Sequence, residues 1–228
     1  MRHLPLKEQL VQSCRVLAAF DVFDDQGHLS ARSPDDHDSA YINEFTSPVT
    51  AGLQQFALFD VTGEPYPEDA PSETTIHARI YDRRDDVGAI CHNHSPFAVA
   101  VSSVGIEMRP VHSAGAVQLD PIPVYEAYDP EGGMLITTDA EADAVTDVLG
   151  DGRAMMLRGH GAVVAGESVT EAVLASLRLE YNARMLYRQA SISEPWYLPR
   201  ERLETMIETM YSDRVMEKSM DYFLSASR

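Results

Sequence analysis

The chain has 228 residues, of which 44% are hydrophobic, and its formal net charge at neutral pH is -18. This length and hydrophobic content suffice to bury the core of one domain. The negative charge argues against a nucleic-acid partner, because such proteins need clustered Lys and Arg. No stretch approaches the roughly 18 apolar residues of a membrane span, and residues 1–11 lack the apolar segment of a secretory signal. We therefore expect a soluble, cytoplasmic protein with no membrane or nucleic-acid partner.

The first half of the chain shows apolar periodicity interrupted by turn residues. Helices are expected over residues 4–20 and from an N-cap at Ser72 through Tyr81. Strands are expected over residues 28–32, 56–59 and 87–94. Polar or proline-rich loops separate these elements at residues 21–27, 33–52 and 65–70.

The second half continues the alternation of strands and helices. Further helices are expected to begin at Ser95-Pro96, at a cap formed by Thr138 or Asp139, and at Thr170, and a helical region is expected over residues 200–224. Extended segments are expected over residues 122–125, 154–157 and 162–165. Because no linker interrupts the pattern, we expect a single α/β domain over residues 1–228.

The two cysteines, Cys14 and Cys91, lie far apart in the sequence and have no CxxC spacing. This arrangement favours neither a disulfide framework nor a zinc ribbon. Cys91 adjoins His92 and is a candidate nucleophile, but a buried thiol on a strand is the preferred interpretation.

His92 and His94 are separated by one residue in an expected strand. Side chains on a strand alternate between the two faces, so both imidazoles project to the same side and can converge on one ion. His160 lies between two glycines, directly after the expected strand over residues 154–157. Three neutral imidazoles suit Zn, with Fe, Mn or Co as alternatives, and they leave coordination positions open as in a catalytic site.

Glu73 lies in the first turn of an expected helix, where the helix dipole favours an ionised carboxylate. It is a candidate general acid/base beside the metal, or a labile fourth ligand. His77 lies one helical turn further along and is interpreted as structural. Surface or loop roles are expected for the remaining histidines: His3, His28, His37 and His112.

The ordered set of Glu73, His92-Asn93-His94 and Gly159-His160-Gly161 resembles the class II aldolase/adducin family over residues 10–190. The resemblance implies a three-layer α/β/α fold with a central, mainly antiparallel sheet. It also implies a homotetramer with the metal site near a subunit interface. By the same resemblance, His92, His94 and His160 are the ligands of one divalent transition metal per subunit, and Glu73 is the acid/base.

One departure from the family concerns the substrate. Sugar-phosphate aldolases of the family carry a Gly-Asn-x-Ser element that binds phosphate, whereas this chain has His28 at the Asn position, followed by Ser30 and Arg32. Before Glu73, the double Ser of those aldolases is reduced to Pro71-Ser72. The variant loop resembles a branch with dihydroxyphthalate-type decarboxylases and an aminocoumarin-pathway oxygenase. Ser30, Arg32 and Ser72 are therefore the candidate substrate-binding residues, and Arg32 either pairs with a substrate carboxylate or is a surface arginine.

These features favour a metal-dependent lyase that cleaves a C–C bond, as a decarboxylase or an aldolase, in a small carboxylated and aromatic substrate. A metal ion would stabilise the negative charge left on the substrate oxygens, and Glu73 would move the proton. A non-haem iron oxygenase acting on an aromatic 2-oxo or 2-hydroxy acid would use the same three histidines. A non-catalytic adducin-like interaction domain is the third hypothesis. The sequence alone does not separate decarboxylation, aldol cleavage and oxygenation.

Overall fold

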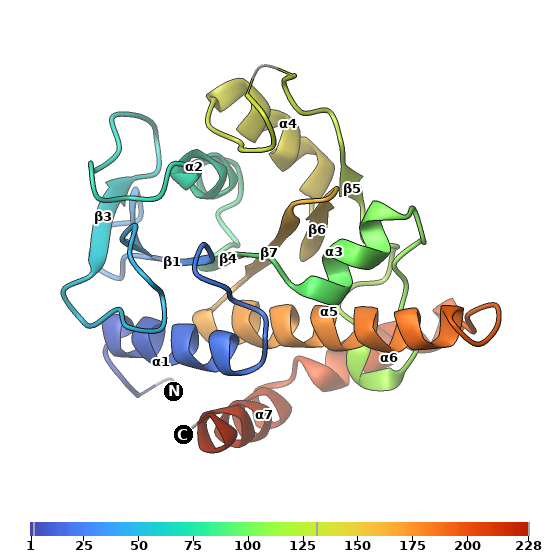
Figure 1. Cartoon of the computed structure of the whole chain (residues 1–228). Helices are drawn as coiled ribbons and strands as arrows, with labels where there is room; N and C mark the ends of the chain where they lie inside the picture. Colours follow the sequence, from blue (N-terminus) through green and yellow to red (C-terminus); the bar gives the residue numbers. More distant parts are fainter. Residues whose placement is uncertain (2, 131, 228) are drawn as a thin grey trace.

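A seven-stranded sheet in the order β3-β2-β1-β4-β7-β6-β5 forms the centre of the fold (Figure 1). The computed structural model describes residues 1, 3–130 and 132–227. Neighbouring strands are antiparallel except for the parallel pair β5 and β6. The strands are β1 (His28–Arg32), β2 (Ser39–Asn43), β3 (Phe56–Asp60), β4 (Ala89–Asn93), β5 (Val124–Tyr125), β6 (Ala154–Leu157) and β7 (Gly161–Gly166). The expected α/β fold with a central, mainly antiparallel sheet is thereby confirmed.

Helices cover both faces of the sheet (Figure 1). One face packs against α1 (Leu6–Ala19), α3 (Pro96–Ser103), α5 (Val169–Ala190) and α7 (Asp213–Ala226). The other face packs against α2 (Thr74–Arg83) and α4 (Asp139–Leu149). The remaining helices are the short 3-10 helix η1 (Ser113–Gly115) and α6 (Arg200–Met210). The layers are therefore helix, sheet and helix, as expected.

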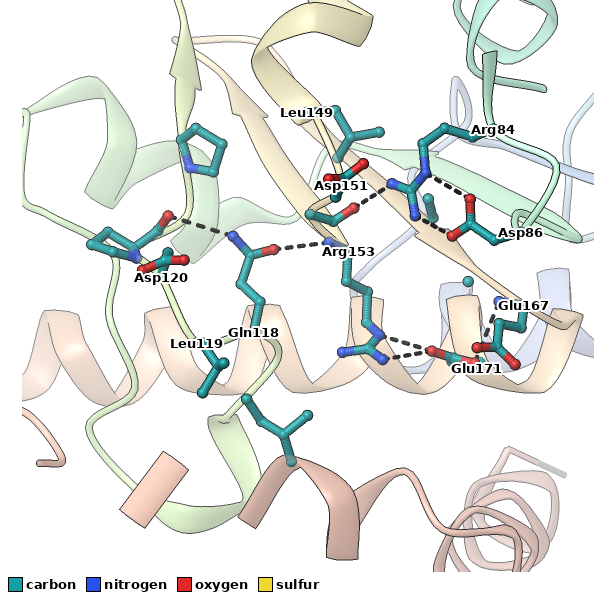
Figure 2. A pocket seen from close by; sticks show the side chains of 16 residues that line it. Arg84, Asp86, Gln118, Leu119, Asp120, Leu149, Asp151, Arg153, Glu167 and Glu171 are labelled. Atoms are coloured by element: carbon teal, nitrogen blue, oxygen red, sulfur yellow. Dashed lines mark hydrogen bonds and ion pairs between the residues drawn. The ribbon is translucent and has the colours of Figure 1, made fainter. Parts of the chain in front are cut away.

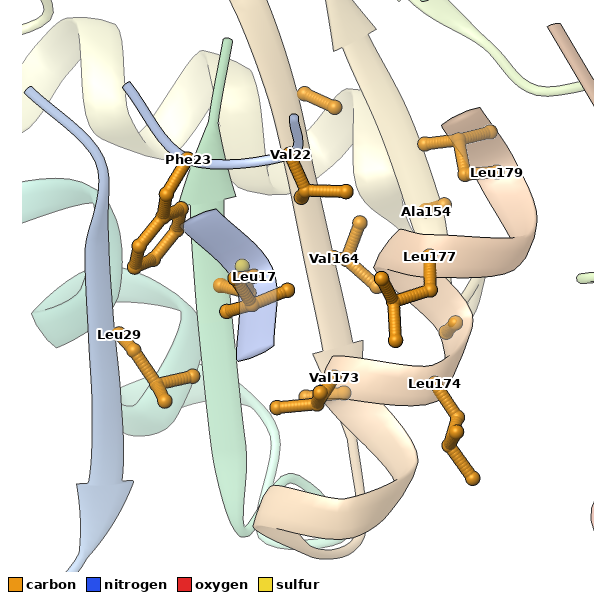
Figure 3. Packing of buried hydrophobic residues seen from close by; sticks show 14 of the residues in the cluster. Leu17, Val22, Phe23, Leu29, Ala154, Val164, Val173, Leu174, Leu177 and Leu179 are labelled. Atoms are coloured by element: carbon orange, nitrogen blue, oxygen red, sulfur yellow. The ribbon is translucent and has the colours of Figure 1, made fainter. Parts of the chain in front are cut away.

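The period-2 alternation of the strands decides which side chains face which layer. On β4, Ala89 and Cys91 join the core beneath α5, whereas Ile90 joins the core beneath α2 and α4. Figure 3 shows the first of these cores, in which Leu29 of β1 and Val164 of β7 pack towards side chains of α1 and α5. His92 shares the parity of Ile90, so it lies on the face covered by α2.

Several boundaries differ from the sequence-based expectations. Strand β2 was not expected, because only two of its five residues, Ala40 and Ile42, form an apolar alternation. Glu73, not Ser72, is the N-cap of α2, and Ser168, not Thr170, caps α5 by accepting a hydrogen bond from the Glu171 N–H. The expected helical region over residues 200–224 is divided into α6 and α7. Among the described residues, no helix has the length and apolar character that a membrane crossing requires.

Candidate metal site and active site

Three histidines meet at one end of the sheet. His92 is on β4, His94 follows the end of that strand, and His160 is on the turn that joins β6 to β7. One ligand nitrogen from each ring lies within 4.8 Å of the corresponding nitrogen of the other two. The ring centroids are 4.9 to 5.1 Å apart. The three imidazoles therefore surround a single point, as ligands of one ion would.

Several ring nitrogens of this cluster lack hydrogen-bond partners among the described residues. His92 is fully buried, and neither of its ring nitrogens has a partner among the described residues. The same holds for His94 Nε2. Burial lowers the pKa of His92 well below its usual value, and it also lowers the pKa of His160. Ring nitrogens that are shielded from water and have no hydrogen-bond partner are costly unless something binds them, so this donor set fits a divalent transition metal.

Glycines allow His160 to reach the cluster. Gly159 has a φ of +70°, a conformation that residues with side chains rarely adopt. At Gly161, a Cβ atom would lie 2.4 Å from the Asn93 carbonyl oxygen, so only glycine permits this approach to β4. The turn closes with a hydrogen bond from the His160 N–H to the Leu157 carbonyl. These constraints bring His160 over the end of β4.

Asp24, in the loop after α1, holds His94 in place. Its carboxylate oxygens lie 2.9 and 3.1 Å from His94 Nδ1. Since an ionised carboxylate only accepts hydrogen bonds, Nδ1 carries the proton and Nε2 is left with a lone pair. A carboxylate behind a histidine is the usual outer partner of a metal ligand. The sequence analysis did not identify Asp24, because its position in a loop gives no periodic signal.

Glu73 extends its carboxylate into the same cluster from the N-terminus of α2. Oε1 accepts a hydrogen bond from the Ile136 N–H at 2.9 Å. Oε2 lies 3.5 Å from His92 Nε2 and 3.6 Å from His160 Nε2. Burial raises the pKa of this carboxyl, but His28, His160 and the Ile136 amide outweigh that effect and leave the pKa below its usual value. An ionised carboxylate thus faces the histidines, positioned as an acid/base would be.

The structure also brings His28 to the site, where the sequence predicted a surface or loop role. It is 4% exposed on β1, and its Nε2 lies 3.8 Å from Glu73 Oε2. Its other nitrogen is 2.8 Å from His77, which is fully buried on α2. A pattern that could have identified it is the pair His28-x-Ser30 on one strand face, opposite Glu73, His77 and Tyr81 at four-residue spacing on one helix face.

The three candidate substrate-binding residues lie apart from one another. Ser72 is exposed next to Glu73. Ser30 is fully buried, and its hydroxyl contacts His77 and Tyr81. A substrate therefore has no direct access to Ser30 in this structure.

Arg32 lies at the other end of β1, away from the histidines. Its guanidinium donates to the backbone carbonyls of four residues, His37, Tyr81, Arg84 and Val87. It also lies over the Tyr81 ring at 4.8 Å. These contacts commit the donors of Arg32 to backbone carbonyls, so the geometry gives no support to its pairing with a substrate carboxylate, and that role stays a prediction.

Both cysteines are buried and free. Burial raises the pKa of the Cys91 thiol to about 11, and its side chain joins the core beneath α5, on the opposite face from His92. A neutral thiol that faces away from the site is a poor nucleophile.

A second concave region lies at the opposite end of the same strands (Figure 2). This cavity has a volume of about 650 Å³. Its charged groups include the ion pairs Arg84–Asp86 and Arg153–Glu171. None of the residues proposed for the metal site lines it.

Known proteins resemble the chain in sequence and in fold. It is 28% identical over 198 residues to a 3,4-dihydroxyphthalate decarboxylase from Arthrobacter keyseri, covering 79% of this chain and 77% of that protein. It is 27% identical over 184 residues to an L-fuculose phosphate aldolase from Methanocaldococcus jannaschii, covering 78% and 94%.

Among solved structures, an aldolase II superfamily protein from Pseudomonas syringae has the same fold. Its TM-score is 0.80 at 21% identity, covering 97% of this chain and 91% of that one. Residues 8–187 match the family model described as the class II aldolase and adducin N-terminal domain. The chain therefore belongs to the class II aldolase and adducin family.

Proposed function

We propose that the protein is a divalent-metal-dependent lyase that cleaves a C–C bond in a small carboxylated substrate. One observation carries the proposal: histidine nitrogens that lack hydrogen-bond partners among the described residues and one ionised carboxylate oxygen converge at the end of the sheet. In this assignment His92, His94 and His160 hold the metal, with zinc as the first candidate and iron, manganese or cobalt as alternatives.

A metal bound there supplies Lewis-acid stabilisation of the negative charge that forms on substrate oxygens. Glu73 acts as the general acid/base. Its ionised Oε2 takes the proton of a substrate hydroxyl and returns it to carbon after the C–C bond has broken. The Ile136 amide holds the other carboxylate oxygen, so Oε2 keeps its orientation through the transfer.

The substrate proposal favours a carboxylic acid, aromatic in the first instance, and decarboxylation over aldol cleavage of a sugar phosphate. One feature supports it. Ser30 is fully buried and its hydroxyl contacts His77 and Tyr81, so it offers no free group to a phosphate.

The test combines metal analysis with product detection. Purified protein is analysed for bound metal and incubated anaerobically with hydroxylated aromatic carboxylic acids while CO2 is measured. We expect about one metal ion per chain and CO2 release without O2. Aldehyde formation from sugar phosphates would support aldol cleavage, and a requirement for O2 would support an oxygenase.

A histidine variant and its control complete the test. His160→Ala is expected to lose stoichiometric metal and roughly a thousandfold in kcat/KM, because metal ions contribute several kcal/mol to such reactions. His37→Ala removes an exposed histidine at the other end of β1 and should change neither property. Metal-free protein that is unchanged by His160→Ala would contradict the lyase proposal and favour an adducin-like interaction domain.

We also propose that the chain forms a homotetramer. Large apolar side chains are exposed on the described surface, among them Val104, Ile192 and Trp196, and such groups are typical of protein interfaces when they are contiguous. Light scattering of the purified protein measures the molar mass of the assembly, and the mass of a monomer would contradict this proposal.

A further inference from the structure

Between β1 and α2, four buried side chains form a hydrogen-bonded chain that leads to Glu73. Tyr81 OH lies 2.9 Å from Ser30 Oγ, and Ser30 Oγ lies 2.7 Å from His77 Nδ1. His77 Nε2 lies 2.8 Å from His28 Nδ1. The chain ends at His28 Nε2, which is 3.8 Å from Glu73 Oε2. All four side chains are at most 4% exposed, so solvent does not compete for these bonds.

The direction of the chain follows from counting protons, beginning at Tyr81. Burial raises the pKa of this phenol, so it keeps its proton. Among the residues that the structure describes, Ser30 Oγ is the acceptor within reach of the hydroxyl. Ser30 therefore accepts from Tyr81 and donates its own proton to His77 Nδ1.

The two histidines continue in the same direction. Burial lowers the pKa of His77 well below its usual value, so the ring carries one proton. Because Nδ1 accepts from Ser30, that proton is on Nε2 and is donated to His28 Nδ1. His28 in turn carries its proton on Nε2, the nitrogen that faces Glu73.

We propose that His28 is a positioning residue for Glu73, fixed by Tyr81, Ser30 and His77 as a donor towards the Glu73 carboxylate. The 3.8 Å separation is longer than a hydrogen bond, so the His28 N–H acts on the carboxylate through electrostatic attraction across that distance. Glu73 Oε2 is thereby held towards His92 and His160. This inference rests on the proposed function in taking Glu73 as the acid/base.

The same series of hydrogen bonds excludes His28 as a metal ligand. Judged by distance alone, His28, Glu73 and His92 could also hold an ion. A ligand nitrogen must present a lone pair, which would require the proton of His28 to be on Nδ1. With His77 unchanged, that tautomer would place the N–H of His28 against the N–H of His77. If His77 changed its tautomer as well, every hydrogen bond in the series would reverse its direction, and the Tyr81 hydroxyl would lose Ser30 as its acceptor.

Nitrogen-15 NMR of the histidine rings tests the tautomers without any substrate. The protein is measured metal-free and with Zn²⁺, which is diamagnetic, and His28→Gln and His77→Gln identify the two sets of signals by their loss. We expect both rings to be protonated on Nε2 in both samples. A His28 ring protonated on Nδ1 would overturn the proposal and would favour His28 as a ligand.

Kinetics of conservative variants test the positioning role. Tyr81→Phe removes only the hydroxyl that sets the direction of the hydrogen bonds. Loss of an outer hydrogen-bond partner of this kind lowers activity roughly tenfold. We expect kcat to fall by about that factor with KM and metal content unchanged, and the NMR signals of His28 to show a mixture of tautomers.

A matched pair at His77 separates positioning from packing. Gln can donate and accept in place of His77, whereas Leu fills space without either capacity, so His77→Gln should retain more of kcat than His77→Leu. Equal kcat in the two variants, or unchanged tautomers in Tyr81→Phe, would overturn the proposal. If the wild-type protein shows no lyase activity, the proposed function fails, and the NMR result still decides the tautomer of His28.

Discussion

The two ends of the central sheet both carry buried polar groups, but they satisfy them differently. At the cavity end, Figure 2 shows the ion pairs of Arg153 with Glu171 and of Arg84 with Asp86. Arg153 also donates to the Val117 carbonyl, and Arg84 to the Gly152 carbonyl. At the histidine end, neither ring nitrogen of His92 has a hydrogen-bond partner in the part of the chain that the structure describes. Strands β4, β6 and β7 run between the two ends, so one scaffold carries both arrangements.

In this protein, a large cavity does not mark the polar groups that are free to bind a ligand. The cavity of about 650 Å³ is lined in part by charged groups that are already paired, Arg84 with Asp86 and Arg153 with Glu171. Polar groups that are paired within the protein stabilise it, whereas unpaired buried groups cost stability unless a ligand satisfies them. The histidine end should therefore respond to substitution through binding and catalysis, and the cavity end through stability.

The largest effect is expected at Glu73. Glu73→Gln keeps the shape of the side chain and an oxygen that can accept from Ile136, but it removes the proton-accepting carboxylate. Loss of a general acid/base lowers kcat by about 10²- to 10⁴-fold. Steady-state kinetics and metal analysis of the variant check this. Full activity would show that Glu73 is not the acid/base, and a loss of metal in parallel would indicate that it is a ligand.

A smaller effect is expected at Asp24, which supports a ligand from behind. Asp24→Ala removes the acceptor of the His94 Nδ1–H, so the ring can rotate or change tautomer. Outer partners of metal ligands are worth about 10- to 100-fold in metal affinity, and competition with a chelator measures that change. Asp25→Ala is the matched control, because this neighbour bonds to Gln26 and not to His94. Equal affinities in the two variants would contradict the role of Asp24.

Part of the histidine end of the sheet could be predicted from the sequence. Strand β1 and the strand that carries His92 could be predicted, because apolar alternation and bordering turns mark them. His92, His94 and His160 could be grouped because local signals, namely the one-residue spacing and the flanking glycines, identify them. Their convergence, however, depends on β6 and β7 folding back onto β4, which the sequence indicated only through the two neighbouring extended segments expected over residues 154–157 and 162–165.

Asp24, His28 and Arg32 show why the rest of the site could not be predicted. Each has a role that is set by a partner distant in the sequence: His94 for Asp24, His77 for His28, and the carbonyls of residues 81, 84 and 87 for Arg32. No periodicity within β1 distinguishes a histidine that faces Glu73 from one that faces solvent. The pairing of His28 arises from the packing of α2 against the sheet, and the pairing of Asp24 arises from the approach of the loop after α1 to the end of β4.

At the cavity end, the expected effect is on stability alone. Glu171 is 6% exposed and accepts from Arg153 at 2.8 Å, so Glu171→Gln weakens a mostly buried ion pair. A loss of about 2 kcal/mol in the free energy of unfolding is expected. Asp86→Asn, which weakens the exposed pair with Arg84 on the same cavity, should cost less than about 1 kcal/mol. Urea denaturation measures both, and a loss of metal or kcat in either variant would break the contrast between the two ends.

An effect on the pH dependence of stability is expected from Glu180, a buried carboxyl near the histidine end that does have partners. Its side chain accepts from the N–H groups of Phe97 and Ala98 at the start of α3, the helix that follows His94. Because it is satisfied, its substitution should alter stability and leave metal binding unchanged. Burial raises the pKa of Glu180 to about 7 from an ordinary value of 4.5.

The folded state thus holds this proton more tightly than the unfolded state does, so its contribution to stability is lost as the pH rises through about 7. The glutamine of Glu180→Gln cannot ionise, so the stability of the variant does not fall in this way. As the pH rises from about 5.5 to about 7.5, the free energy of unfolding of the variant should increase relative to that of the wild type by on the order of 1 kcal/mol. Urea denaturation at both pH values measures the difference, with Glu208→Gln on the exposed face of α6 as the control. An opposite sign would mean that Glu180 is stabilised as a carboxylate, and that the α3 amides and Arg184 outweigh its burial.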